Sequence, residues 1–555
     1  MPPLARESAD FGLAAIASGR LSWGVMTRWP SRAGLALVVF SLTAPFSQLR
    51  ASEVCATCHA DRVKGYSRSA MAQSLRRPAQ EPEGAFEHPA SGTKFTASLK
   101  PDGYWQRRER DGAVSNYRIE YVIGSGKHAE GYIVRVGNHL FQSPITYYPR
   151  IHRYDMAPGY ETARTPDFIR PLTLECVLCH AGEPRHIAGT LSEYESPAFG
   201  AEAITCDRCH GDPAKHLENP GRGTIVNPAK LPPALRSSVC EQCHLTGAAR
   251  VTNPGKKFQD FLPGQRLEEI FTIYTATLPA GAPQAGLKVI SHSEQLAVSR
   301  CSIASPDQMW CGTCHDPHDL SAQPASYYRE RCLACHAGTL EKTHAGGRDK
   351  ADCVACHMAR RNAKDGGHTV FTDHHISRQP LPDTGDEQPR DFDLKAWREP
   401  PTEFRQRNLA LAYASSGFEH GSATRIVRGL HMLEEAEKQF PDDPEVLAAL
   451  GTAYLAVRQP RDAVLRLERV VELRPSTSLD EASLGAAWLG AGRMDKALPH
   501  LERAVERDPL LFTTVEALMQ VYQSQGDEAK AMALAERVRQ ALGNTAPLET
   551  NPKEP

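Results

Sequence analysis

Seven copies of one five-residue motif are the part of this 555-residue sequence whose side chains can do chemistry. Each copy reads C-x-x-C-H, and together the copies use fourteen of the fifteen cysteines. Two thiols separated by two residues can each form a thioether with the same porphyrin, and the histidine that follows is then placed to bind the iron. The motifs therefore predict seven covalently bound haem c groups. The predicted attachment residues are Cys55, Cys58, Cys176, Cys179, Cys206, Cys209, Cys240, Cys243, Cys311, Cys314, Cys332, Cys335, Cys353 and Cys356. The predicted proximal iron ligands are His59, His180, His210, His244, His315, His336 and His357.

Zinc sites and disulfides are the alternative uses for paired cysteines. Structural zinc is held by four cysteines or by two cysteines and two histidines, often from C-x-x-C pairs. Neither alternative requires a histidine directly after the second cysteine in all seven copies. An odd number of pairs also cannot be matched two by two into four-cysteine sites. The fifteenth cysteine, Cys301, has no spare partner and reads as a small buried thiol.

Composition and charge limit the range of partners. Lys and Arg total 64 against 66 for Asp and Glu, which leaves a formal net charge of −2 and no block of one sign. This balance gives no reason to expect nucleic acid. Hydrophobic residues other than glycine make up 41% of the chain, an ordinary share for a globular protein.

The N-terminal stretch 1–51 is interpreted as a signal peptide or an N-terminal extension. Residues 33–46 are uncharged and mostly apolar, and Arg28 and Arg32 precede them. This run is too short to span a bilayer as a helix and fits the apolar part of a secretory signal. A true start at Met26 would give that signal a short basic beginning. We therefore expect a periplasmic or otherwise exported protein, with a membrane anchor as the alternative if the segment is not cleaved.

Residues 94–147 carry the clearest strand pattern. Alternating runs such as KFTASL, NYRIEYVI and GYIVRV are separated by PDG, DG and GN, which is typical of short antiparallel strands and tight turns. Elsewhere in 52–378 the hydrophobic periodicity is weak. The sequence therefore predicts a mainly α fold: an irregular seven-haem cytochrome domain over 52–378 with a small antiparallel β insertion at about 94–147, followed by an α-helical repeat solenoid.

The C-terminal third repeats with a period of 34 residues, the pattern of tetratricopeptide (TPR) helix–turn–helix units. Positions that keep this step are Leu450, Leu484 and Leu518, Tyr454, Trp488 and Tyr522, Ala463, Ala497 and Ala531, and Gly451 and Gly485. The predicted boundaries are 379–401 for a proline-rich linker, 402–545 for the repeats and 546–555 for a tail. Because a TPR array has a concave surface suited to a peptide or helix, we expect it to dock a redox partner or a second copy of the chain. Cutting the linker near Asp391 is then expected to leave the haem spectrum unchanged.

The motif-rich region resembles the multihaem cytochromes of the cytochrome c-554 and hydroxylamine oxidoreductase-like group, a branch of which carries C-terminal TPR repeats. The resemblance covers about 52–378 and is carried by CDRCHGDPAKH (206–216), SHSEQLAVSRC (291–301), CGTCHDPH (311–318), CVACHM (353–358) and HTVFTDHHI (368–376). In that family a histidine shortly after one motif commonly binds the iron of a neighbouring haem. The resemblance therefore implies six distal ligands: His128, His216, His292, His318, His368 and His374.

One departure from the family leaves the seventh distal ligand open. The family often reads S-x-H-A after the first motif, where this chain has Met71 in place of the histidine. A methionine ligand would raise the potential of its haem relative to a site with two histidines. The candidates for this place are Met71, His88, His186 and His344.

The ligand on the distal face of each iron decides between two functions. Irons with two protein ligands make an electron carrier, which the sequence favours. The alternative is an oxidoreductase that acts on nitrite, hydroxylamine, tetrathionate or a similar small nitrogen or sulfur compound at one five-coordinate haem. No catalytic residue is assigned. The tyrosine-rich run 145–154 (ITYYPRIHRY) either lines a pocket or packs between porphyrins.

Overall fold

The computed structural model describes residues 51–220, 225–277, 286–319, 324–343, 352–378 and 392–541. The predicted signal at 33–46, the candidate ligand His344, most of the predicted linker (379–391) and the predicted tail (546–555) lie outside the described residues. Among the helices that are described, none combines the length and the apolar character needed to cross a membrane.

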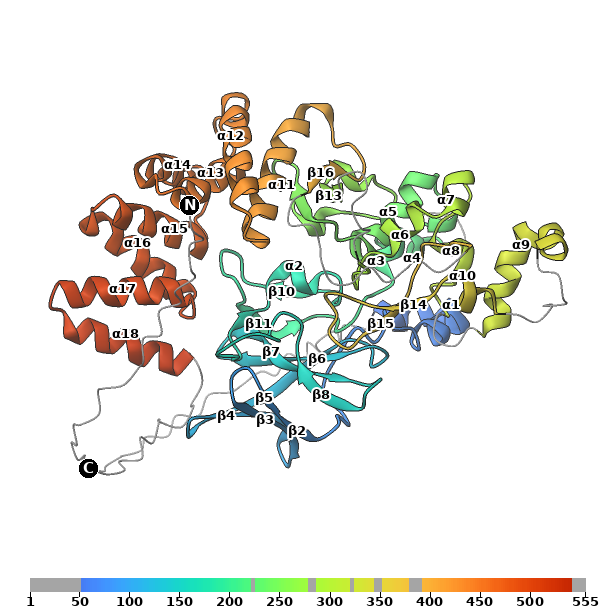
Figure 1. The fold of residues 1–555 in the computed structure, drawn as a ribbon, viewed down its shortest axis with the longest axis horizontal. Helices are drawn as coiled ribbons and strands as arrows, with labels where there is room; N and C mark the ends of the chain where they lie inside the picture. Colours follow the sequence, from blue (N-terminus) through green and yellow to red (C-terminus); the bar gives the residue numbers. More distant parts are fainter. Residues whose placement is uncertain are drawn as a thin grey trace, which may run out of the picture. The chain divides into compact units, whose positions relative to one another are not determined.

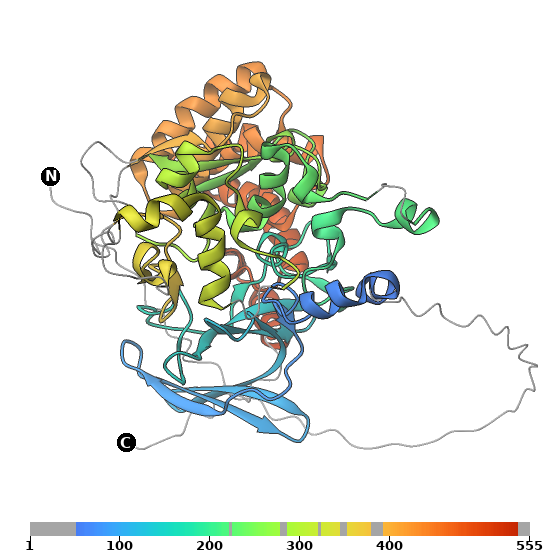
Figure 2. The same cartoon turned by 90° about the vertical axis from the view of Figure 1, so that its right-hand side faces the viewer.

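A nine-stranded antiparallel sheet is the largest β element (Figure 1). Its strands follow the order β2-β3-β4-β5-β6-β7-β8, with β1 paired to β5 and β9 paired to β7. Strands β2 and β8 also contact each other, so the sheet curves back on itself, and Figure 2 shows its blue and teal strands strongly twisted. The strands are β1 (Leu75–Arg76), β2 (Gly84–His88), β3 (Thr93–Lys100), β4 (Gly103–Arg110), β5 (Ala113–Ile123), β6 (Glu130–Val136), β7 (His139–Tyr148), β8 (Arg153–Met156) and β9 (Arg170–Pro171).

The alternation read from the sequence places one face of this sheet in a hydrophobic core. Phe95, Tyr132 and Phe141 are at most 2% exposed and pack with Tyr117 and Phe168 in one cluster. Tyr117 and Phe168 stack with ring centroids 4.0 Å apart. The core of this part of the chain is therefore built from side chains and does not depend on porphyrins.

The prediction of a mainly α fold with a small β insertion is wrong. The sheet runs from Leu75 to Pro171, well beyond the predicted 94–147. The strands missed on either side have two to five residues each. Segments this short show too few alternations to be recognised, and they exist only because long neighbouring strands offer backbone hydrogen bonds.

The haem-motif region between the sheet and the repeats consists of short helices and three small antiparallel sheets. Its helices, together with the N-terminal one, are α1 (Ala51–Tyr66), α2 (Leu174–Val177), α3 (Asp207–His210), α4 (Ala214–Glu218), α5 (Pro233–His244), α6 (His292–Ala297), α7 (Arg300–Ala304), α8 (Cys311–Cys314), α9 (Ala325–Thr343) and α10 (Cys353–His357). The small sheets pair β10 (Pro184–His186) with β11 (Tyr194–Phe199), β13 (Phe271–Thr277) with both β12 (Ala249–Thr252) and β16 (Asp393–Ala396), and β14 (Arg360–Asn362) with β15 (Val370–Thr372). Single 3₁₀ turns are η1 (Pro228–Lys230), η2 (Phe258–Asp260), η3 (Leu267–Glu269) and η4 (Thr402–Phe404).

The C-terminal part is a helical repeat region, as the 34-residue period predicts (Figure 1). Its helices are α11 (Arg405–Glu419), α12 (Ala423–Gln439), α13 (Pro444–Ala456), α14 (Pro460–Leu473), α15 (Ser478–Gly490), α16 (Met494–Arg507), α17 (Phe512–Ser524) and α18 (Glu528–Ala541). Helices α13, α15 and α17 begin at residues 444, 478 and 512, a step of 34. The repeated glycine serves close packing, since a Cβ added at Gly451 would collide with Leu467 of the next helix.

The first repeat helix is bonded to the haem-motif region through buried polar groups. Arg407 of α11 is fully buried and donates to the carbonyl of Thr252 in β12, with Nη1 and O 2.7 Å apart. Its other nitrogens form a two-point ion pair with Asp443, at 2.7 and 3.1 Å. The neighbouring Asn408 donates to the side chain of Asn253 at 2.7 Å. Arg407 therefore ties the repeats and the haem-motif region into one folded unit.

Replacing Arg407 with methionine is expected to lower the free energy of unfolding by about 3 kcal/mol, because Asp443 would keep a buried charge without its partner. Urea unfolding followed by circular dichroism measures this loss. Arg469→Ala is the matched control. Both side chains of the Arg469–Asp442 ion pair are exposed, so this substitution should leave the free energy of unfolding unchanged. Equal stability of the two variants would contradict the structural role of Arg407.

Candidate functional site

Every C-x-x-C-H motif lies on a helix or at its end. Motifs 1 and 3 to 7 fall on α1, α3, α5, α8, α9 and α10, and motif 2 starts on α2 (Figure 1). Residues three and four positions apart share one face of a helix. In motifs 4, 6 and 7, whose cysteines and histidine all lie within the helix, the two thiols and the imidazole are therefore presented on the same side, as attachment to one flat ligand requires.

The motifs are also brought next to one another. Four pairs of thiols from different motifs lie close enough for one thiol to shift the pKa of the other: Cys55 with Cys206, Cys179 with Cys243, Cys240 with Cys311, and Cys332 with Cys353. Motifs 3 and 4 are joined by the Gln242 amide, which donates to the carbonyl of Arg208 at 3.0 Å. The thiols of Cys314 and Cys335, from motifs 5 and 6, are electrostatic neighbours. These contacts connect all seven motifs in one continuous group.

Four motif histidines lie near histidines that the family resemblance implies as distal ligands, and two of the latter, His292 and His374, also lie near each other, with ring centroids 4.7 Å apart. The ring centroids are separated by 6.3 Å for His59 and His216, 5.7 Å for His210 and His318, 6.0 Å for His244 and His292, and 6.1 Å for His315 and His374. Two imidazoles bound to opposite faces of one metal ion, each through a nitrogen about 2 Å from the metal, have centroids about 6 Å apart. The four separations match this value.

The hydrogen bonds of these rings leave nitrogens free for a metal. The Nδ1–H groups of His210 and His374 donate to the carbonyls of Val226 and Thr372, at 2.8 and 3.0 Å. Such a bond orients the ring and keeps a lone pair on Nε2. The Nδ1 atoms of His216, His292 and His315 are buried with no partner in the part of the chain that the structure describes. Buried polar atoms without partners are uncommon and point to a missing ligand.

Burial favours the neutral imidazole, which is the form that binds a metal. It lowers the pKa of His292 to about 3, helped by the nearby His374 and His244, and lowers the pKa of His374 to about 4, helped by His315. The pKa values of His244 and His315 are also lowered by burial. Each of these rings is therefore uncharged at neutral pH.

A haem iron needs only two ligands from the protein, because the porphyrin nitrogens supply the other four. The described residues hold no cluster of three or more His, Cys, Asp or Glu side chains arranged around one metal position. They do hold the facing pairs given above. The donor set thus fits haem: two thiols and one imidazole from each motif, and a second imidazole from elsewhere in the chain at four of the motifs.

Two of the six implied distal ligands do not face a motif histidine within the described residues. His128 stacks on Phe371, with centroids 4.2 Å apart. The Nε2 atom of His368 lies 3.0 Å from Oδ2 of Asp155, and its ring contacts the edge of Tyr148. Asp155 comes from the nine-stranded sheet, so this use of His368 depends on a contact that the sequence around residue 368 does not reveal.

The candidates for the seventh distal ligand differ in the hydrogen bonds that they or their neighbours make. Both ring nitrogens of the buried His88 are bonded, to Ser91 and to the carbonyl of Glu161. His186 bonds the carbonyl of Leu191. Met71 lies on a turn whose Ser74 donates to the carbonyl of His180 at 2.7 Å. Met71 is thus placed next to motif 2, while His59 of motif 1 already faces His216.

The three remaining motif histidines have different surroundings. His180 of motif 2 is partly exposed, and desolvation of its ring lowers its pKa. The Nδ1–H of His357 donates to the carbonyl of Ser377 at 2.8 Å, as expected of a metal-binding ring whose tautomer is fixed. His336 is exposed on α9.

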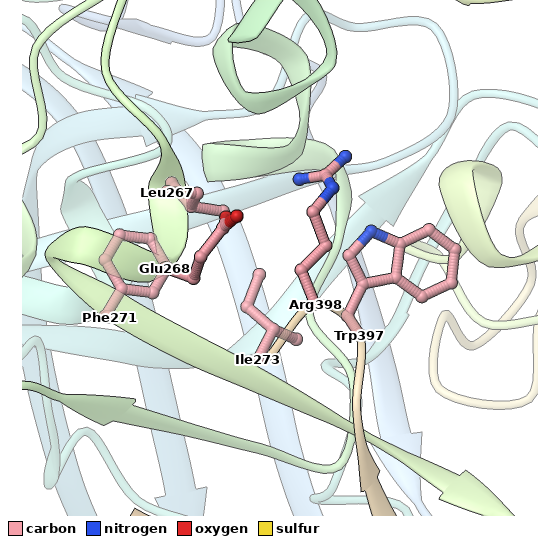
Figure 3. Close-up of a pocket in the computed structure, with 6 residues that line it drawn as sticks. All are labelled: Leu267, Glu268, Phe271, Ile273, Trp397 and Arg398. Atoms are coloured by element: carbon pink, nitrogen blue, oxygen red, sulfur yellow. The ribbon is translucent and has the colours of Figure 1, made fainter. Parts of the chain in front are cut away.

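Residues at the end of the predicted linker hold motif 4 in place. Trp397 donates to one oxygen of Glu241, at 3.2 Å, and Arg398 forms an ion pair with the other at 2.6 Å. Glu241 stands between Cys240 and Cys243. Figure 3 shows Trp397 and Arg398 beside Glu268, Phe271 and Ile273, around a void of about 10 Å³, roughly the room of one water molecule. This tight packing makes the two residues a support for the motif, which the proline-rich composition of the linker did not indicate.

The structure changes what is expected of a chain that ends near Asp391. Such a chain lacks β16, which pairs with β13, and it lacks Trp397, Arg398 and Arg407. Tyr413 of α11, whose hydroxyl accepts from the backbone of Leu394 at 3.2 Å, is lost as well. We therefore no longer expect this truncation to leave the haem spectrum unchanged.

Comparisons with known proteins give no functional assignment. No family model matches the chain, and no curated protein matches it. Among solved structures it is similar to "MamA MSR-1 C2", with 24% identity over 25% of this chain and 78% of that one, and a TM-score of 0.22. It is also similar to "Crystal structure of MamA", with 23% identity over 22% of this chain and 73% of that one, and a TM-score of 0.21. Likenesses this low carry no argument about function.

The facing pairs lead to a prediction for single histidines. His318→Met replaces the ring opposite His210 by a thioether, so one site with two imidazoles should disappear and the potential of that haem should rise. Low-temperature electron paramagnetic resonance and a spectroscopic redox titration of the haem-loaded protein measure both effects.

Two controls accompany this variant. His368→Gln changes a histidine that the sequence also nominates but that bonds Asp155, and it should keep the number of low-spin haems. His431→Gln changes an exposed histidine of the repeats and should alter nothing. A His318→Met protein with the parent spectrum and potentials would show that His318 is not a ligand.

Proposed function

We propose that this chain is an exported multihaem c-type cytochrome whose haem-motif region carries electrons, and that its helical repeats are TPR units that dock a partner protein. The observation that carries the proposal is the set of four facing histidine pairs, with centroids 5.7 to 6.3 Å apart. Each pair joins a motif histidine to a histidine from a different part of the sequence. A metal-binding group with two open positions on opposite faces explains this spacing.

Haem, when bound, supplies reversible one-electron exchange at its iron. The residues of this chain would have three tasks around it. The motif thiols fix the group covalently. The paired imidazoles would hold the iron of the group, and the Nδ1–H bonds of His210 and His374 to carbonyls orient those two rings. His292 and His374 are partly shielded from water, and this shielding favours their neutral form.

The contacts between motifs favour electron transfer over storage in isolated sites. Motif 1 touches motif 3, motif 3 touches motif 4, and motif 4 touches motifs 2 and 5 through their thiols or backbone. Motifs 5, 6 and 7 continue the series. Rapid electron transfer through a protein needs short distances between redox groups. Because the series of motifs branches at motif 4, electrons could leave it by more than one route.

The repeats are proposed as the docking element because stacked helical hairpins form extended binding surfaces. Their contacts with the rest of the chain run through Arg407 and through Asp508, whose carboxylate accepts from the backbone N–H of Leu191 at 2.9 Å. A partner held by the repeats would therefore be held at a fixed position relative to the haem motifs. The candidate partners are a redox protein or a second copy of this chain.

The haem content is the first test. Protein matured by the c-type haem attachment machinery should have the mass of the chain plus seven haems. A mass with fewer than six haems would contradict the assignment of the motifs, and zinc in their place would contradict the proposal as a whole.

The second candidate function is reduction or oxidation of a small nitrogen or sulfur compound at one five-coordinate haem. Motif 2 is one candidate for that haem, because His180 has no ring contact with another histidine in the described part of the chain. Electron paramagnetic resonance of the oxidised protein separates the two functions. An electron carrier should show only low-spin haems, whereas an enzyme should show a high-spin signal that shifts when nitrite, hydroxylamine or cyanide is added.

A further inference from the structure

A cavity of about 340 Å³ lies outside the haem motifs, between the nine-stranded sheet and the β14–β15 hairpin. Its lining includes Arg150 and Ile151 from the turn between β7 and β8, and Asn362, Lys364 and His368 from the hairpin. Small-molecule sites range from about 300 to 1,000 Å³, so the cavity has room for a small ligand and water. The tyrosine-rich run 145–154 thus does line a pocket, through its arginine.

The two segments that form this cavity are held together by specific contacts. His368 bonds Asp155 of β8 at 3.0 Å and meets Tyr148 of β7 edge-on, with ring centroids 5.0 Å apart. Gly367 has a φ of +58°, and a Cβ at this position would collide with the Tyr148 hydroxyl. The loop therefore approaches the sheet as closely as only glycine allows, which gives the cavity a defined shape.

The charge in the cavity is positive and lacks a counter-charge. No acidic side chain is among its lining residues. The Asp155 carboxylate is shared by His368 and Arg153. The Asp365 carboxylate is occupied by the backbone N–H of Val289, at 2.8 Å. Arg150 and Lys364 thus line the same cavity, and among the described residues no ion pair joins either of them to a carboxylate.

Lys364 supplies a second, independent observation. Its ammonium nitrogen is shielded from solvent and has no hydrogen-bond partner among the described residues. Shielding a charged ammonium without any acceptor is costly, so such a group normally has an anion beside it. The backbone N–H of Lys364 bonds the carbonyl of Leu287 at 2.9 Å, which fixes the residue at the cavity.

We propose that this cavity is a binding site for a small oxyanion, separate from the haem irons. The Arg150 guanidinium offers paired N–H groups that match two oxygens of one anion, and the shielded Lys364 ammonium adds a positive charge beside the cavity. Asn362 adds an amide that donates to oxygen. Neutral molecules would leave both charges uncompensated and cations would be repelled, so an oxyanion is the class that fits. The proposal does not rest on the electron-carrier function.

The test is calorimetric titration of the haem-loaded full chain with inorganic phosphate, nitrite and acetate in separate runs, with chloride as the comparison. One saturable site is expected for at least one oxyanion and none for chloride. The anion that binds most tightly shows whether the site prefers an inorganic oxyanion or a carboxylate. Arg150→Ala and Lys364→Met should each weaken binding at least about tenfold, the usual effect of losing one charged hydrogen bond. Arg150→Lys, which keeps the charge, should lose less.

Controls separate this site from non-specific attraction and from binding at iron. Arg461→Ala removes one exposed positive charge from the repeats and should leave the affinity unchanged. Circular dichroism and the haem spectrum show whether each variant is folded. If Lys364→Met does not fold, the comparison of Arg150→Lys with Arg150→Ala tests the proposal. Equal binding by all variants, or heat without saturation, would overturn the proposal. So would an anion-dependent change in the haem spectrum that persists with the same affinity in Arg150→Ala.

Discussion

Four pairs of imidazole rings, each with centroids 5.7 to 6.3 Å apart, are the constraint on which the proposed site depends. A five-residue motif can fix one ring and two thiols locally, but the opposing ring must come from a distant segment. His216, for example, reaches motif 1 from beyond motif 3, and His318 reaches motif 3 from beyond motif 5. Each such pair closes a long loop of chain, at an entropic cost that rises only slowly with loop length. In the proposed cytochrome, the binding free energy of the iron would offset this cost.

This arrangement explains why the haem-motif region has so little regular structure. Its helices have as few as four residues, and helices this short are not stable by themselves. They are supported instead by side chains inserted from elsewhere. Gln242 bonds the backbone of motif 3, and Trp397 and Arg398 bond Glu241 of motif 4. The nine-stranded sheet and the helical repeats, which have their own hydrophobic cores, provide rigid surfaces on both sides.

The parts of the fold that could be predicted from the sequence are those set by local, repeated patterns. The 34-residue period locates the repeat helices because every unit buries the same positions, such as Leu450 and Leu484. The motifs locate one face of each candidate site. The family resemblance identified His216, His292, His318 and His374, which all face motif histidines. It also implied His368, whose Nε2 is instead bonded to Asp155. Nothing near residue 368 in the sequence signals that contact.

The misjudged linker has the same physical origin as the misjudged sheet. Residues 393–396 become a strand only because β13 offers its free edge, and Leu75–Arg76 become one only because β5 does. Strand formation is decided by the neighbouring strand as much as by the segment's own residues, so composition alone predicts both stretches to be irregular.

The pairing of β16 also affects the candidate site. Because β16 leads directly into Trp397 and Arg398, the same strand pairing that attaches the repeats also positions the two residues that hold Glu241 between the thiols of motif 4. Attachment of the repeats and support of that motif are therefore one structural feature, and any force that a docked partner exerts on the first repeat helix is transmitted to this motif through a few bonded residues.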